Sequence, residues 1–329
     1  MSEEFQTGAP ESSKTNYWLP ILLFLLTFAT TTIAGKEWIS GYSPRTELTD
    51  LVQGLPFSLS ILFVLACHEF GHYFASMFHK VKTSLPYFLP FFSFQGMILN
   101  FGTLGALIRT REPIQTKKAL FDIGIAGPIA GFIASLGVLI YGFLNVPDLD
   151  YLLRIHPDYF APDYGKNSLM LLFGDNLLFS SLRWLIVPPD MFFPPMSEIY
   201  HYPYLCVGWF GLFVTSMNLI PVGQLDGGHI VYSMFGDKIH KTVSSISLIL
   251  LVALGIIGII ENYMALNTSI GWIGWLFWAA VLNFILKRDH PPVYDSTELD
   301  LKRKIIGYIG ILIFILSFTP VPFYIGGTI

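Results

Sequence analysis

The sequence predicts an all-α polytopic membrane protein with about seven transmembrane helices and one membrane-embedded re-entrant β-hairpin. Only 13% of the 329 residues are charged and 53% are hydrophobic, whereas a soluble domain usually carries about 25% charged residues. Several apolar runs also reach the length of about 20 residues that crosses a bilayer as a helix. The expected spans are 17–34, 55–78, 119–143, 204–223, 242–261, 268–286 and 304–321.

The expected spans divide the chain into three parts. Residues 1–16 are polar and lack the short basic region that opens a secretory signal, so we interpret them as a cytoplasmic N-terminus before a retained anchor. Residues 17–232 form the membrane core that carries the candidate site, and 242–329 supply the C-terminal transmembrane helices. The two cysteines lie in apolar segments and indicate neither a disulfide framework nor a cysteine metal site.

The apolar run over 85–108 is long enough to span the membrane but is interrupted along its length. Its sequence is "LPYFLPFFSFQGMILNFGTLGALI", which is punctuated by Pro86, Pro90, Gly96, Gly102 and Gly105. Such residues favour a bent or hairpin segment over a straight helix. Backbone without internal hydrogen bonds cannot face lipid, so the hairpin must lie against protein or line a wet cavity.

The placement of basic residues favours the re-entrant interpretation of 85–108. If this segment enters and leaves on one side, the six basic residues around it share one face of the membrane: Lys80, Lys82, Arg109, Arg111, Lys117 and Lys118. Eight others join them: Lys14, Lys238, Lys241, Lys287, Arg288, Lys302, Arg303 and Lys304. The opposite face receives Lys36, Arg45, Arg154, Lys166 and Arg183. Because cytoplasmic loops are enriched in Lys and Arg, the N-terminus is expected in the cytoplasm.

Segment 144–203 is then a long outer loop. It contains the apolar patch "LMLLFGDNLLF" and the proline-rich stretch "VPPDMFFPPM". These stretches are typical of an element that lies on a surface, and nothing in them indicates a separately folded domain.

The span over 55–78 carries the motif "HEFGH" at 68–72. On a helix, His68 and His72 project from one face one turn apart, which suits two ligands of a tetrahedral zinc ion. Glu69 is placed to accept a proton from a water that the metal activates. An ionisable side chain at bilayer depth costs about 2.5–3.5 kcal/mol on insertion scales. The alternative interpretation is a chance match to the motif, in which the histidines make ordinary interhelical hydrogen bonds. The cost of burying all three groups in a membrane argues against it.

A third zinc ligand is expected from the run "NLIPVGQLDGGH" at 218–229. In the re-entrant topology the spans 55–78 and 204–223 both run from outside to inside. Asp226 then lies at the same depth as His68 and His72, and the candidate site holds one Zn²⁺. Asn218, two turns earlier, is a candidate hydrogen-bond donor to a substrate carbonyl, although an interhelical hydrogen bond is nearly as probable on these grounds. We interpret His229 as structural.

These motifs resemble those of the site-2 proteases, the zinc intramembrane metalloproteases of peptidase family M50. "HEFGH", "FGTLGALIRTREP", "FDIGIAGPIAGF" and "NLIPVGQLDGG" carry the resemblance, which covers about 55–232. It implies that His68, His72 and Asp226 bind zinc, that Glu69 is the catalytic base and that Asn218 assists at the substrate carbonyl.

The resemblance also bears on the hairpin. It implies that segment 85–108 guides the substrate, with four candidate substrate-binding residues: Gly96, Asn100, Gly102 and Gly105. The sequence departs from the family in having no PDZ-like insertion after the HExxH span. We assign no role to His201.

The resemblance implies a hydrolase that cleaves single-span membrane proteins within or near their transmembrane segments. The alternative is a metal or ion transporter that uses His68, His72 and Asp226 as its transport site, since ionisable groups in membranes often mark ion pathways. A transporter would assign no special role to Glu69.

The expected location is the cell membrane, because no transit-peptide composition precedes the first span. The lipid bilayer and membrane-protein substrates are the expected partners. The sequence shows no basic tail that would suggest binding to nucleic acid, so no nucleic-acid partner is expected. The oligomeric state is left open.

Overall fold

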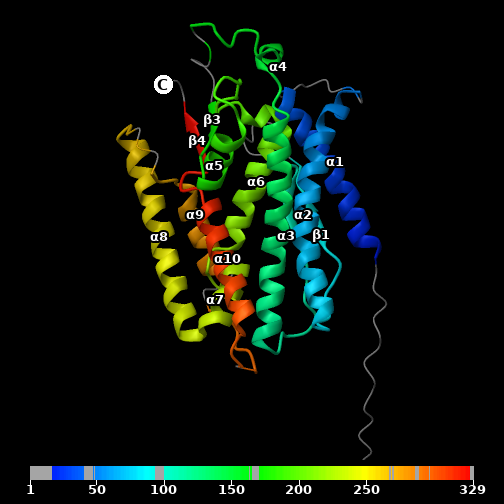
Figure 1. The fold of residues 1–329 in the computed structure, drawn as a ribbon, viewed down its shortest axis with the longest axis vertical. Helices are drawn as coiled ribbons and strands as arrows, with labels where there is room; N and C mark the ends of the chain where they lie inside the picture. The colour runs from blue at the N-terminus through cyan, green and yellow to red at the C-terminus, as the bar shows by residue number, and fades with distance from the viewer. Residues whose placement is uncertain are drawn as a thin grey trace, which may run out of the picture.

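The computed structural model is mostly helical (Figure 1). It describes residues 17–40, 47, 49–92, 100–162, 164, 170–266, 268, 270–285, 289–295 and 297–326. The longer helices are α1 (Trp18–Ser40), α2 (Leu55–Phe78), α3 (Lys117–Leu144), α6 (Pro203–Asn218), α8 (Asp237–Tyr263) and α10 (Leu301–Ser317). The shorter helices are η1 (Asp50–Gly54), α4 (Leu149–Ile155), α5 (Leu177–Ile186), η2 (Ile199–His201), α7 (Asp226–Phe235), α9 (Gly274–Ala280) and η3 (Val281–Ile285). The strands are β1 (Tyr87–Pro90), β2 (Thr103–Leu107), β3 (Met170–Phe173) and β4 (Phe323–Gly326).

The structure has a helix in each of the seven expected spans, but their lengths differ. Four are long and apolar enough to cross a membrane: α1, α2 with the preceding η1, α3 and α8. The other three expected spans hold shorter helices, with 16 residues in α6, 17 in α10, and α9 continuing into η3. The count of seven spans therefore stays a prediction.

The central part of the fold is formed by α2, α3 and α6, which stand side by side (Figure 1). Small residues let these helices approach closely. A Cβ on Gly208 of α6 would lie 2.7 Å from the Cβ of Leu139 on α3, and one on Gly211 would lie 2.2 Å from Ser135 Oγ. Ten of the 16 residues of α6 are buried. Because neighbouring helices enclose α6, its length is not set by the thickness of the bilayer.

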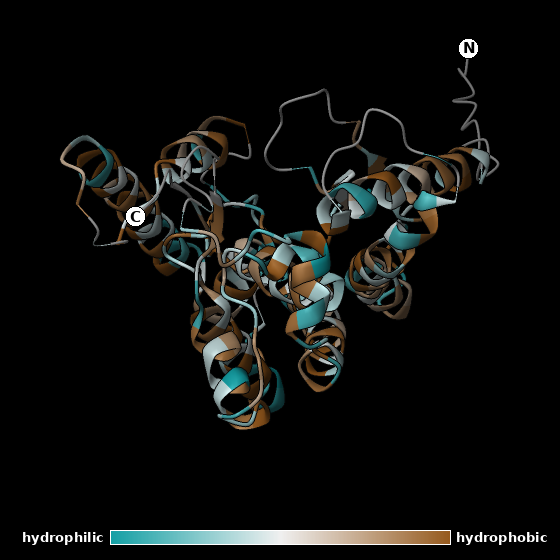
Figure 2. Cartoon of the chain, turned by 90° about the horizontal axis from the view of Figure 1, so that it is seen from above, coloured by the Kyte–Doolittle hydropathy of each residue, from teal (hydrophilic) through white to brown (hydrophobic). Residues whose placement is uncertain are grey.

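The outer helices expose much of their apolar surface. Only 22% of the most apolar stretch of α8 is buried, against 56% for α3. Viewed from above, hydrophobic residues colour the outward faces of the helices as well as the faces between them (Figure 2). An apolar exterior of this kind suits contact with lipid and would be unusual on a soluble protein.

The hairpin expected within 85–108 is present as the antiparallel pair β1–β2, with Tyr87 opposite Leu107 and Phe88 opposite Ala106. It packs against α1, where Thr30 Oγ1 donates a hydrogen bond of 2.6 Å to the Gly102 carbonyl. In Figure 1, α2 ends and α3 begins at the end of the molecule where α7 meets α8, which we name the α7 end. The chain between α2 and α3 thus leaves and returns at one end. Its depth in a membrane stays a prediction.

The outer segment 144–203 is more structured than expected. It contains α4, β3, α5 and η2, and β3 pairs with β4 in antiparallel register, with Phe173 opposite Phe323. This second sheet was not predicted, because a short apolar run such as "MLLF" does not distinguish a strand from a helix. The sheet lies near α4 at the end opposite the α7 end, here named the α4 end (Figure 1).

An ion pair joins α10 to α3 at the α7 end. Arg303 donates to both carboxylate oxygens of Asp122, over 2.8 Å from Nε and 2.6 Å from Nη2. His79, which ends α2, lies 2.8 Å from the same carboxylate. Asp122 therefore connects three helices.

We expect the Asp122–Arg303 pair to contribute about 1 kcal/mol of coupling energy, the upper end for a partly exposed pair, because its geometry is bidentate. The measurement is a double-mutant cycle of Asp122→Ala and Arg303→Ala by thermal unfolding in detergent. The exposed pair Asp237–Lys241, four residues apart on α8, is the control and should give below about 0.5 kcal/mol. Equal coupling in the two cycles would contradict the special role of the bidentate pair.

Candidate metal centre

The first two candidate ligands come from one face of α2. Proline in the first turn and an apolar run promote this helix, which continues to the cap at His79. The i, i+4 spacing places His68 and His72 one above the other, with their ring centroids 4.8 Å apart. His68, Glu69 and His72 are all buried.

Asp226 reaches the histidines because the chain breaks sharply between α6 and α7. α6 ends at Asn218, and the following turn includes Gly223 at a φ of +57°. A Cβ on Gly227 would lie 2.0 Å from the Leu219 carbonyl oxygen, so the turn is tight enough to require glycine there. This turn starts α7 at Asp226 and brings its carboxylate next to α2.

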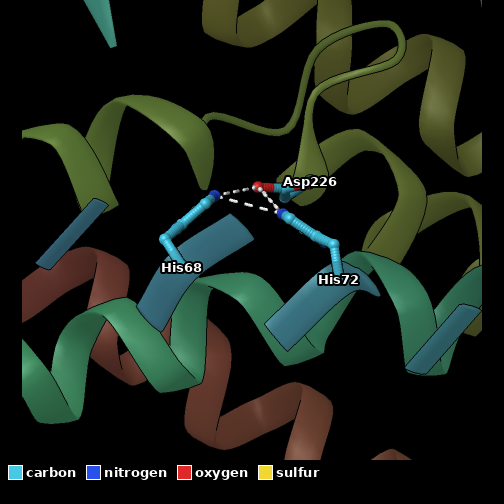
Figure 3. A group of neighbouring side chains, drawn as sticks. All are labelled: His68, His72 and Asp226. Carbon is cyan, nitrogen blue, oxygen red and sulfur yellow. Dashed lines mark hydrogen bonds and ion pairs between the residues drawn. The ribbon is translucent and has the colours of Figure 1, made fainter. Parts of the chain in front are cut away.

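Figure 3 shows the two imidazoles and the carboxylate converging on one point. His68 Nε2 lies 3.1 Å from His72 Nε2, and Asp226 Oδ2 lies 3.5 Å and 3.4 Å from these two atoms. A tetrahedral zinc ion with bonds of about 2.0–2.1 Å keeps its ligand atoms about 3.3 Å apart. The donor types and their separations therefore fit one zinc ion, with a fourth position left open.

Residues outside this triangle orient the ligands. His72 Nδ1 lies 2.7 Å from the Ile123 carbonyl oxygen. Because a carbonyl can only accept, Nδ1 carries the proton and the lone pair of Nε2 faces the site. Two glycines of α3 leave space for the rings. A Cβ on Gly127 would lie 2.1 Å from His72 Nε2, and one on Gly131 would lie 3.0 Å from His68 Nδ1.

Two further predicted site residues lie beside the triangle. Asn218 Nδ2 is 3.2 Å from His68 Nε2. Glu69 lines the same cavity as Ile108, which lies just past β2. The structure thus brings together all five residues expected at the metal: His68, Glu69, His72, Asn218 and Asp226.

The site opens into a cavity of about 430 Å³. One wall is the end of the hairpin, Ala106–Ile108, and another is the stretch His290–Val293 between η3 and α10. This second wall was missed, because the sequence indicated only a linker there. His290 Nε2 lies 2.7 Å from His229 Nδ1, which attaches the stretch to α7. The signal available in the sequence was a histidine followed by two prolines, which hold the backbone extended.

The three predicted substrate-binding residues that the structure describes, Asn100, Gly102 and Gly105, are not among the residues that line this cavity. Asn100 donates to Glu37 Oε2 over 3.1 Å, and its carbonyl accepts from the Trp38 indole, so it faces α1. Gly102, at a φ of +70°, packs against Thr30, and Gly105 has no neighbour within 4 Å of an added Cβ. Gly96 lies outside the described residues. A role of these four residues in substrate binding stays a prediction.

Comparison with known proteins gives a family. The model of the family described as Peptidase family M50 matches residues 56–257. A relative named "Probable zinc metalloprotease EGY2, chloroplastic" from Oryza sativa subsp. indica is 26% identical over 97% of this chain and 52% of its own length. "Probable zinc metalloprotease EGY1, chloroplastic" from Arabidopsis thaliana is 28% identical over 81% of this chain and 43% of its own length. The chain spans about half the length of these curated relatives or less. No solved structure shows a significant match.

The glycines of α3 provide a graded test of the metal centre. Gly127→Ala should lower zinc affinity tenfold or more, as loss of an orienting contact typically does, because the new methyl group displaces the His72 ring. Gly131→Ala should have a smaller effect, since its methyl group is less crowded. Zinc retained against a competing chelator measures both.

Gly137→Ala is the matched control for these variants. It lies on the same helix, and an added Cβ has no neighbour within 4 Å, so zinc affinity should be unchanged. If Gly127→Ala retained zinc as well as Gly137→Ala, the proposed contact with His72 would be refuted.

Proposed function

Because the chain belongs to peptidase family M50, we propose that it is a zinc metalloprotease that hydrolyses peptide bonds within or near transmembrane segments of other membrane proteins. One observation carries the proposal. Two buried imidazoles and a partly buried carboxylate with zinc-like separations lie among apolar helices, with a glutamate and a cavity beside them. A site among helices that cross a membrane would be accessible to substrates that are themselves in the membrane.

His68, His72 and Asp226 would hold the zinc ion. When bound, zinc supplies a Lewis acid that polarises a carbonyl and acidifies a water molecule. The protein contributes the fixed geometry, through the Ile123 carbonyl on His72 and the tight turn before Asp226. Apolar helices around the site exclude bulk water, which strengthens electrostatic interactions inside it.

Glu69 would act as the general base. It lies next to His68 in the sequence and lines the same cavity, so a water in the cavity is within its reach. Its carboxylate would accept the proton of the attacking water and deliver it to the leaving amine. Asn218, 3.2 Å from His68 Nε2, would donate from its amide to the oxygen of the scissile carbonyl as negative charge develops there.

The hairpin would hold the substrate by strand addition. A peptide bond in a helix has its N–H and carbonyl already paired, so the substrate must unwind before cleavage. The Arg109 N–H and carbonyl both bond to Ser84, on the β1 side. Successive residues of a strand direct their backbone groups to opposite sides. The N–H and carbonyl groups of Ile108 and Ala106 therefore point away from β1, toward the cavity. An extended substrate segment could pair with this edge and pass close to Glu69.

Proteolysis is favoured over the alternative of metal transport. All of the relatives above are named as probable zinc metalloproteases. The Glu69 carboxylate in the cavity has a role in hydrolysis and none in transport. The donor separations fit a resident zinc ion, and a transport site must release its ion.

The proposal includes the orientation of the chain in the membrane. The α7 end carries Arg303, Lys117 and Lys118, and the rule for basic residues would make it cytoplasmic. Single-span membrane proteins would then present their segments laterally to the hairpin edge. The relatives are named as chloroplastic, whereas a cell-membrane location remains a prediction from the sequence.

Glu69→Gln should reduce cleavage of a single-span substrate by about 10²–10⁴-fold, the usual contribution of a general base, while zinc content stays at the wild-type level. The measurement pairs gel-based cleavage in detergent or proteoliposomes with elemental analysis of zinc. Glu112→Gln is the control, because Glu112 also lines the cavity but pairs with Lys82 over 2.7 Å. Equal cleavage by wild type and Glu69→Gln would exclude the protease proposal.

Ala106→Pro tests strand addition. Proline removes one N–H from the cavity edge of β2 and leaves the β1 side intact, a position where strands tolerate proline. Cleavage of a membrane substrate should fall at least tenfold, with zinc content unchanged. Ala106→Ser keeps the N–H and should cleave normally. Undiminished cleavage by Ala106→Pro would show that substrates do not pair with this edge.

A further inference from the structure

A second group of metal-ligand side chains lies at the α4 end, in the segment between α3 and α6. His156 follows α4, while Glu198 and His201 flank and end η2. His156 Nε2 lies 2.9 Å from His201 Nε2, and Glu198 Oε2 lies 3.7 Å and 3.6 Å from these two atoms. The spacing resembles that of His68, His72 and Asp226. α6 separates the two groups, and its 16 residues make it about 24 Å long.

The burial of this group is difficult to explain without a cation. Glu198 and His201 are 1% and 2% exposed. Glu198 Oε2 is buried and has no hydrogen-bond partner, while Oε1 accepts from the Tyr164 hydroxyl over 3.2 Å. No Lys or Arg in the described part of the chain forms an ion pair with Glu198. A buried carboxylate oxygen with neither hydrogen bond nor counter-ion is costly.

The protonation states of the group suit metal ligation. His201 Nδ1 lies 2.9 Å from the Ile39 carbonyl oxygen, so Nδ1 carries the proton and the lone pair of Nε2 faces the group. A bound cation would stabilise the carboxylate form of Glu198, since an opposite charge favours ionisation.

We propose that His156, Glu198 and His201 form a second transition-metal site, for a zinc-class ion, at the α4 end of the molecule. Two imidazole nitrogens and one carboxylate oxygen are a donor set that zinc binds with four-coordinate geometry. The separations of 2.9, 3.6 and 3.7 Å bracket the value of about 3.3 Å between ligands of tetrahedral zinc. Water fills the fourth position. This site does not depend on the proposed protease activity.

The role of the second ion would be structural. It would join the end of α4 to η2, which leads directly into α6 at Pro203. Through the contact of His201 with the Ile39 carbonyl, it would also fix the end of α1. The neighbouring residues Glu37 and Trp38 bond Asn100 at the start of the hairpin's returning arm. The ion would thus stabilise both the helix that ends at Asn218 and the support of the hairpin.

The test is the zinc stoichiometry of the full-length chain, purified in detergent, loaded with zinc and freed of excess metal. Wild type should retain two ions per chain. Glu198→Gln and His201→Ala should each retain one, and so should His68→Ala, which removes a ligand of the first centre. The combined variant His68→Ala/His201→Ala should retain none. Zinc should also raise the unfolding temperature of Glu198→Gln less than that of wild type, because only the ion at the first centre still binds.

Glu261→Gln is the control for Glu198→Gln, because Glu261 is a buried glutamate of α8 outside both groups, and it should retain two ions. If Glu198→Gln does not fold, His156→Gln replaces it, since the His156 side chain is 28% exposed and its loss disturbs less packing. A wild-type stoichiometry of one that falls to zero in His68→Ala would overturn the second site and leave the first intact. Two ions retained by His156→Gln and His201→Ala alike would also overturn it.

Discussion

The fold is organised around the cost of placing charged groups among apolar helices. Each ionisable side chain at bilayer depth costs several kcal/mol unless it is compensated. His68, His72 and Asp226 approach within 3.5 Å of one another and suit a common cation, which would offset this cost. The close approach requires the glycines of α3 and the tight turn before α7. A cluster of this kind constrains three helices at once.

α6 connects the candidate metal centre to the α4 end of the molecule. It is enclosed by its neighbours, and polar groups lie at both of its ends, with Asn218 beside the candidate metal centre and His201 just before its start. A helix that is short for a membrane span is therefore suited to its position, since protein and not lipid surrounds it. The hairpin is held between α1 and the cavity in a comparable way, with polar contacts to α1 on one side and an edge toward Glu69 on the other.

Several features of the site could not be predicted from local sequence. The stretch at His290–Val293 forms a cavity wall through a contact with His229, and only tertiary structure brings these two histidines together. The β3–β4 sheet joins segments about 150 residues apart, and short apolar strands carry no specific local signal. Asp122 on α3 pairs with Arg303 on α10, and their separation of 181 residues in the sequence leaves no local signal of this contact. The second histidine–glutamate group was also missed, because its members have no recognisable spacing.

The sequence alone predicted the apolar helices and the three side chains, His68, His72 and Asp226, that the structure brings together. These follow from short-range properties: the length of apolar runs, and the i, i+4 spacing that puts His68 and His72 on one face. Tertiary structure alone decided which walls enclose the site, which strand edge faces it, and how His156, Glu198 and His201 meet. Those features depend on how distant segments pack, and packing responds to the shape of the whole molecule rather than to any local pattern.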